Sequence, residues 1–204
     1  MLDEQRIGEV IEACSRDFVG QCYELYQTPS LGRLVRTRCD TDPDTNLYGV
    51  VYNVLTNGMD PTRRPVARGK DETDEDEIYR ASPQLMKLLK SEFHVLVIGC
   101  QKEDQIFQHL PPVPARIHGF VYLCTPEEVK QFSRSFDFLN ILLKTHLDIP
   151  TEELVGAVLR QMSEVYGLER HVFLVSAGKE LANLLSTDYS QLRIILKGLK
   201  NDTT

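Results

Sequence analysis

The chain has 204 residues, of which 42% are hydrophobic and 26% are charged, and its formal net charge is −7. That apolar content is enough to build a core, which excludes wholesale disorder. The acidic balance argues against non-specific nucleic-acid binding as the main role, because such binding requires a basic surface. A local basic patch is still compatible with this charge.

The first half of the chain predicts short β-strands. Its apolar runs are rich in β-branched and aromatic residues, and turn signals at 28–32 and 40–44 separate some of them. The predicted strands are Ile7 to Ala13, Phe18 to Leu25, Leu31 to Cys39, Tyr48 to Thr56, Phe93 to Cys100 and Ile117 to Cys124, with Gln105 to Leu110 as an additional pairing segment. So many short strands favour a closed barrel, since closure leaves no unpaired sheet edge. Glycines at or inside these strands are typical of bulges and corners: Gly8, Gly32, Gly49 and Gly119.

The second half of the chain predicts helices. Thr125 followed by Pro126 and two glutamates is typical of a helix start, and apolar residues then recur at helical spacing up to Leu143. Further helices are predicted from Pro150 to Met162, from Val172 to Leu185 and from Tyr189 to Leu199. The predicted fold is therefore α+β, with a small closed N-terminal β-barrel over residues 1–125 and a C-terminal helical subdomain over residues 126–204.

A polar insert interrupts the predicted barrel over residues 57–92. It begins as a long loop and ends in a predicted helix from Glu77 to Ser91, which Pro83 is expected to bend or restart. Loops this long in compact domains are often functional, although some are only mobile.

The insert holds the most distinctive charge pattern of the chain. Its basic residues precede six acids between Asp71 and Glu77. Arginine binds phosphate or carboxylate through two parallel hydrogen bonds, so the loop is a candidate site for an anionic ligand or an acidic partner surface. The candidate binding residues are Asp60, Arg63, Arg64, Arg68 and Lys70. The alternatives are that the basic and acidic halves pair with each other, or that they form only a solvated surface loop. A further interpretation is that the acidic run caps the helix that follows it.

No catalytic or metal motif is recognisable, and we expect no catalytic residue, no metal site and no cofactor. The Gly69-Lys70 pair lacks the first glycine and the hydroxyl residue of a phosphate-binding loop, which argues against ATP hydrolysis. The five cysteines are scattered without zinc-ligand spacing. Cys14, Cys22 and Cys124 have apolar neighbours, so we expect them to be buried and to act as small hydrophobic residues.

Histidines and prolines also have structural explanations in this sequence. His94 and His118 lie within predicted apolar strands, which favours hydrogen-bonded histidines of the core or barrel wall over ligands. Residues 108–116 are proline-rich, which is typical of a rigid connector between strands or of a polyproline II binding surface. Of these two interpretations, we favour the connector.

The predicted strands carry a family resemblance. Residues 1–125 resemble the HAS barrel, which HerA-type DNA translocases share with the catalytic subunits of ATP synthase, in the stretches Ile7 to Val10, Phe18, Leu31 to Val35 and Tyr48 to Tyr52. Most of the chain further resembles an uncharacterised family of cyanobacteria and plastid-bearing organisms that pairs such a barrel with helices, in the stretches DPTRRPVARGKDE, LPPVPARIHGFVY and FLVSAGKELANLL. In the larger relatives the barrel precedes an ATPase core and helps to assemble the ring or dock accessory subunits. Because this chain has no Walker motif, the resemblance implies docking rather than ATP hydrolysis.

These observations lead to two main hypotheses about function. The first is a non-enzymatic docking or assembly factor that binds a protein partner through the barrel and its arginine-rich loop. The alternative is a module that binds a phosphorylated small molecule or single-stranded nucleic acid through the same arginines, with nucleic acid not favoured. An enzyme with a dispersed site has the least support.

The sequence also carries an expectation about location. The N-terminus has no apolar core of a signal peptide, and no apolar run is long enough to span a bilayer. We therefore expect no membrane insertion and a soluble protein of the cytoplasm, or of the plastid stroma if this is a mature organellar protein.

Overall fold

Six strands close into a barrel in the N-terminal part of the chain. The computed structural model describes residues 5–42, 44–60 and 62–200. The barrel strands are β1 (Arg6–Ala13), β2 (Asp17–Cys22), β3 (Leu34–Arg38), β4 (Asn46–Gly58), β5 (Leu89–Lys102) and β7 (Phe120–Leu123). They lie in the order β2-β1-β7-β3-β4-β5, and an antiparallel pairing of β2 with β5 closes the ring. A short strand, β6 (Gln105–Phe107), pairs with the end of β5 outside this ring.

Helices follow the barrel, as the sequence predicts. They are α3 (Pro126–Phe132), α4 (Leu139–Lys144), α5 (Thr151–Glu164), a 3-10 helix (Gly167–Glu169), α6 (Arg170–Leu184) and α7 (Tyr189–Lys200). The start of α3 has the expected capping box, in which Thr125 Oγ1 accepts from the Glu128 amide and Glu128 accepts from the Thr125 amide. The predicted α+β fold, a closed barrel followed by helices, is confirmed.

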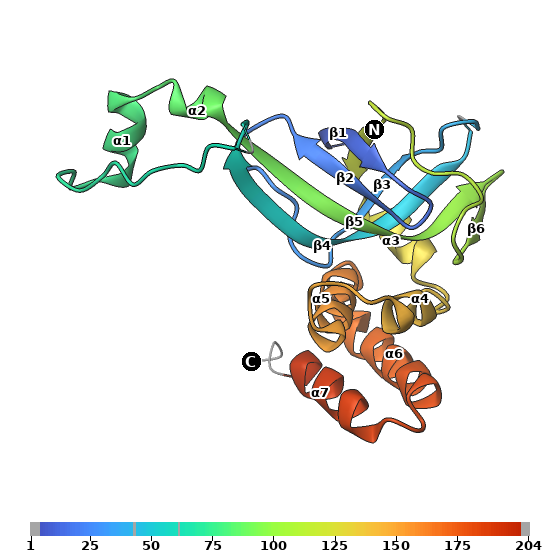
Figure 1. Ribbon diagram of the computed structural model, residues 1–204. Coiled ribbons are helices and arrows are strands. Elements are labelled where there is room, and N and C mark those ends of the chain that lie inside the picture. The colour runs from blue at the N-terminus through green and yellow to red at the C-terminus, as the bar shows by residue number, and fades with distance from the viewer. Residues whose placement is uncertain (1–4, 43, 61, 201–204) are drawn as a thin grey trace.

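Two apolar clusters meet at the wall formed by β3, β4 and β5. Side chains of a strand point alternately to its two faces, and both faces are buried here. In β5, Val95 and Val97 belong to the cluster inside the barrel, whereas Leu96 and Ile98 belong to a cluster that continues into the helices. Figure 1 shows α4 to α7 stacked against one side of the barrel. The barrel wall and the helices therefore share one core, with Phe132 of α3 fully buried in it.

The helical segment that begins at Pro126 is not one continuous helix. The apolar spacing predicts a helix up to Leu143, but α3 ends at Phe132 and α4 begins only at Leu139. The side chain of Gln108 holds this break: its amide nitrogen donates to the Phe132 carbonyl at 2.6 Å, and its amide oxygen accepts from the Phe138 backbone nitrogen at 3.0 Å. A residue from outside the segment thus supplies partners for backbone groups that a continuous helix would pair internally.

Three predicted strands extend too far in the sequence-based prediction. Residues 23–25, 31–33 and 117–119 lie in turns or bends or outside any strand, and the additional pairing segment likewise ends at Phe107 rather than Leu110. Gly32 and His118 have φ angles of 79° and 61°, which are left-handed conformations that interrupt a strand. The predicted placement of His118 in the core or barrel wall is therefore wrong, because its side chain is exposed. It is hydrogen-bonded as predicted, with its ring 3.2 Å from the Glu9 carboxylate.

The prediction that Cys14 is buried is also wrong. It lies in the turn after β1, where its thiol donates to the Asp17 carboxylate at 3.1 Å. Cys22 and Cys124 are buried as predicted, and so are Cys39 and Cys100. Burial raises the pKa of Cys22 to about 11 and also raises the pKa of Cys124.

This difference in exposure predicts selective alkylation. We expect iodoacetamide at mildly alkaline pH to label Cys14 first in the folded protein, because only an accessible thiolate reacts. Mass spectrometry after a short reaction should show one label, and all five cysteines should react after unfolding in guanidinium. Comparable labelling of Cys22 or Cys124 in the folded protein would contradict their burial.

None of the helices among the described residues combines the length and apolar character needed to cross a bilayer.

Candidate functional site

The insert projects from the barrel on the ends of two long strands (Figure 1). β4 and β5 remain paired to Gly58 and Leu89, and the Met59 amide then donates to the Leu88 carbonyl at 2.8 Å. We call residues 59–88 the arm. It contains the short helices α1 (Glu75–Ala81) and α2 (Leu85–Leu88).

The predicted helix from Glu77 to Ser91 is wrong in its extent. Two short helices replace it, and Pro83 lies in the break between them as expected. The end of the predicted helix is strand, because Ser91 pairs with Thr56 across the β4–β5 ladder. The apolar residues of this segment suit a helix locally, but pairing with β4 decides their conformation.

Tyr26, from the loop after β2, holds the arm against the barrel. Its hydroxyl lies 2.6 Å from the hydroxyl of Tyr79 on α1, and the two rings meet edge to face. Its backbone amide donates to Ser91 Oγ at 3.0 Å, and Ser91 Oγ lies 2.8 Å from Thr56 Oγ1. The arm is therefore held at α1 by a residue distant in sequence, and that residue is itself bonded to the β4–β5 ladder.

All five predicted site residues lie on the arm, and all are exposed. Arg63 Nε lies 3.7 Å from the Asp60 carboxylate, an exposed pair. Asp60 also accepts hydrogen bonds from the hydroxyl and the amide of Thr62, and these bonds lower the pKa of its carboxyl. Within the described part of the chain, Arg64, Arg68 and Lys70 have no ion-pair partner. No ion pair there links the cations of residues 63–70 to the acidic run 71–77, whose Asp74 lies 4.0 Å from Arg80 of α1 instead.

The acidic half of the arm has a structural role instead. Asp74 is the N-cap of α1 and accepts from the Asp76 amide at 3.1 Å. Glu75, Asp76 and Glu77 form its first turn, where negative charge is favourable next to unpaired backbone N–H groups. Among the described residues, the basic run 63–70 and the acidic run 71–77 therefore do not pair with each other. The acids help to start a helix, and the cations face solvent.

Large apolar side chains are exposed beside these cations. Val66 lies between Arg64 and Arg68 in the sequence and is 75% exposed. Others gather at the root of the arm: Leu55, Met59, Met86 and Leu88. Exposed apolar groups next to arginine are typical of protein interaction surfaces.

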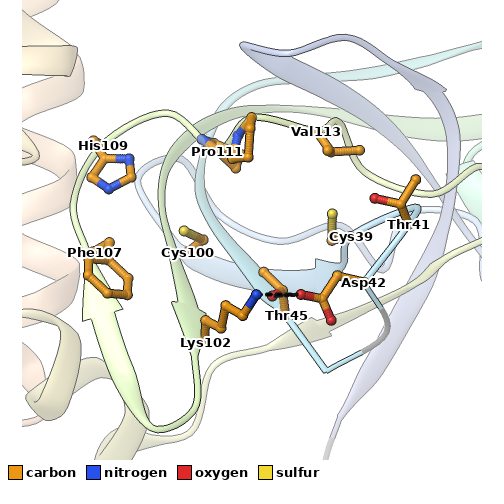
Figure 2. Close-up of a pocket in the computed structure, with 11 residues that line it drawn as sticks. Cys39, Thr41, Asp42, Thr45, Cys100, Lys102, Phe107, His109, Pro111 and Val113 are labelled. Carbon is orange, nitrogen blue, oxygen red and sulfur yellow. Dashed lines mark hydrogen bonds and ion pairs between the residues drawn. The ribbon is translucent and has the colours of Figure 1, made fainter.

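β6 lies at the end of the barrel opposite the arm (Figure 1). A cavity of about 390 Å³ lies beside it, and Figure 2 shows residues that line it. Its walls are mostly apolar and include Phe107, Pro111, Pro112 and Val113, with the buried thiols of Cys39 and Cys100. Figure 2 shows Lys102 and Asp42 meeting at its edge, where Lys102 Nζ lies 3.2 Å from Asp42 Oδ2.

Local turns build this cavity. β5 and β6 are joined by Glu103 and Asp104 alone, with φ angles of 50° and 63°, which is a type I′ hairpin turn. The proline-rich segment then crosses the barrel end, held where Asp40 donates its amide to the Pro114 carbonyl at 3.2 Å and where Cys39 pairs with Ala115.

Of the two charged residues at the cavity edge, Asp42 has further hydrogen-bond partners. Asp42 also accepts from Thr45 Oγ1 at 2.9 Å and from the Asp44 amide, and the pKa of its carboxyl is lowered first by Thr45 and then by Lys102. The Asp42 carboxylate raises the pKa of Lys102. Burial, with a smaller effect of Cys39, raises the pKa of the Cys100 thiol. Cys100 therefore lines the cavity as a protonated thiol at neutral pH and is not a nucleophile.

No pattern in the sequence indicates this cavity. Its lining comes from three separate segments of the chain, and of these only the proline-rich segment has a distinctive sequence, which favours a connector. Among residues 5–42, 44–60 and 62–200, no group of three or more His, Cys, Asp or Glu side chains is arranged to hold a metal ion.

Neither a scan against protein-family models nor a search of curated proteins finds a match to this chain.

Proposed function

We propose that this protein is a non-enzymatic docking or assembly factor whose arm and adjoining barrel bind an acidic surface of a protein partner. The observation that carries the proposal is the unequal use of charge on the arm. Its acids start α1, while Arg64, Arg68 and Lys70 lack an ion-pair partner among the described residues.

The charge of the arm also differs from that of the chain. Residues 59–70 carry four cations against one anion, whereas the chain as a whole has a net charge of −7. Complementary charge accelerates association and excludes partners with the wrong sign. A basic projection on an acidic protein therefore favours one orientation of an acidic partner.

The apolar residues of the arm add a second source of affinity. Exposed charge pairs contribute little by themselves, whereas arginine next to buried apolar contacts is common at interface hot spots. Val66 and Met59 are exposed beside the cations, so a partner can cover apolar surface while pairing with the arginines. The Tyr26–Tyr79 contact holds α1 in place, which lowers the ordering cost of binding.

A small phosphorylated ligand fits the arm less well. The cations lie along an extended, exposed loop, and the cavity beside β6 is not lined by arm residues. Small-molecule sites are usually concave. A broad partner surface suits this arrangement better.

Charge reversal on the arm tests the proposal. We expect the triple variant Arg63→Glu, Arg64→Glu and Arg68→Glu to lose the partner that co-purifies with the wild-type protein from its native host, because each attraction becomes a repulsion. The partner is identified by mass spectrometry, and its affinity is then measured with both proteins purified. We expect the affinity of the triple variant for the partner to be at least a hundredfold lower than that of the wild type. We also expect the affinity of the wild type to decrease as the salt concentration rises.

The matched control reverses three exposed lysines on the helices, Lys130, Lys179 and Lys197, and changes the net charge equally. It should keep wild-type affinity. If both triple variants retain the partner, or lose it equally, the arm is not the docking element. If nucleotides or oligonucleotides raise the melting temperature of the wild type but not of the arm variant, the alternative binding module replaces this proposal.

A further inference from the structure

We infer that the cavity beside β6 binds a small carboxylate that has an aromatic or branched aliphatic body. The site lies at the opposite end of the barrel from the arm and shares no residue with it (Figure 1). The inference is therefore independent of the proposed docking function.

The size and walls of the cavity set the body of the ligand. Its volume of about 390 Å³ lies within the range of roughly 300–1,000 Å³ that is usual for small-molecule sites. Phe107 and the two prolines offer flat apolar surfaces, and Val113 adds a branched one. The Cys39 and Cys100 thiols are buried, and a neutral thiol behaves as a small apolar group. An apolar ligand body thus finds apolar contacts on several sides.

The Lys102–Asp42 pair at the cavity edge determines which charged group the ligand carries. Lys102 is more than half exposed, and Asp42 is the one ion-pair partner it has among the described residues. Asp42 keeps hydrogen bonds from Thr45 Oγ1 and the Asp44 amide if Lys102 turns away. The lysine is therefore the cation that faces the cavity edge, and its ammonium group has three N–H donors, so it can pair with a ligand carboxylate as well as with Asp42. His109 also lines the cavity, and its Nδ1 lies 3.1 Å from the Leu110 carbonyl.

The cavity is largely built before any ligand arrives. Proline fixes its own φ angle and has no amide hydrogen that needs a partner, so Pro111 and Pro112 form a wall without unpaired N–H groups. The type I′ turn places Lys102 at the end of the β5–β6 hairpin. Little conformational entropy is lost when a ligand enters such a site.

Titration with a series of simple carboxylates tests the inference. Benzoate, phenylacetate and phenylbutyrate are added to the isotope-labelled full chain, and amide shifts are followed by NMR. We expect saturable shifts at Thr45, Cys100 and Phe107, which surround the cavity. Phenylbutylamine, which has the same body and the opposite charge, should bind at least tenfold more weakly than phenylbutyrate. Lys102→Met should weaken phenylbutyrate at least tenfold, whereas Lys130→Met, on the exposed side of α3, should not.

A second variant tests the location. Val113→Trp fills the cavity and should abolish the shifts, and Thr41→Trp at the rim serves the same purpose if the first variant does not fold. The inference is overturned if none of the carboxylates gives saturable shifts at millimolar concentration. It is also overturned if amine and carboxylate bind equally, or if binding survives both the lysine and the tryptophan substitutions.

Discussion

Phe132→Ala should lower the free energy of unfolding by about 3–5 kcal/mol, the range for removing a fully buried phenylalanine. Phe132 is 1% exposed, and its ring lies 5.2 Å from the ring of Tyr48 on β4 and 5.7 Å from that of Phe138. It therefore joins the outer barrel wall to the helices, and truncation leaves a cavity where the two meet. Urea denaturation followed by circular dichroism measures the loss.

Phe120→Ala is the matched control for this substitution. Phe120 is on β7 and 43% exposed, with its ring 4.5 Å from the guanidinium of Arg6. Its removal gives up part of one stacking contact and little burial, so we expect a loss of about 1 kcal/mol or less. Equal losses for the two variants would mean that Phe132 is not part of a core shared by barrel and helices.

Gly8→Ala should destabilise the protein by about 3 kcal/mol, a large effect for the addition of one methyl group. A Cβ at this position would overlap the Gln21 carbonyl oxygen and would lie 2.8 Å from the Gln21 carbonyl carbon and 3.2 Å from Cys22 Cα. These are backbone atoms of the neighbouring strand, so no side-chain rotation relieves the contact. The β1–β7 register also shifts between Arg6 and Gly8, which marks a corner of the closed barrel.

Gly178→Ala adds the same methyl group within a helix, and we expect it to stabilise the protein rather than destabilise it. A Cβ there would lie 3.5 Å from Leu196 Cδ2, an ordinary contact. Alanine restricts the unfolded chain and suits a helix, so we expect a gain of about 0.5–1 kcal/mol. Thermal and urea unfolding of both variants measure the difference. A tolerated Gly8→Ala would show that β1 and β2 can separate without cost at this point.

The arm and the cavity are extensions of the same pair of strands in opposite directions. β4 and β5 carry the arm at one end, and β5 continues into β6 and the cavity at the other (Figure 1). Arm substitutions should therefore leave carboxylate binding unchanged, and cavity substitutions should leave partner binding unchanged. The two proposals can fail separately.

The amino-acid sequence by itself determined the fold class and the place of the unusual charges. Alternating β-branched residues before position 125 specify strands, and 3.6-residue spacing after Pro126 specifies helices, because these periodicities are local properties of the chain. The basic and acidic runs of the insert can also be recognised from the sequence, because the charged side chains of an exposed loop stay ionised in water.

Only the tertiary structure decided which segments meet. Ser91 is a strand residue because β4 lies beside it, the helix after Pro126 breaks because Gln108 binds its backbone, and the cavity exists because the proline-rich segment crosses the barrel end. Each outcome depends on contacts between residues far apart in the sequence, and such contacts outweigh local propensities of a fraction of a kcal/mol per residue.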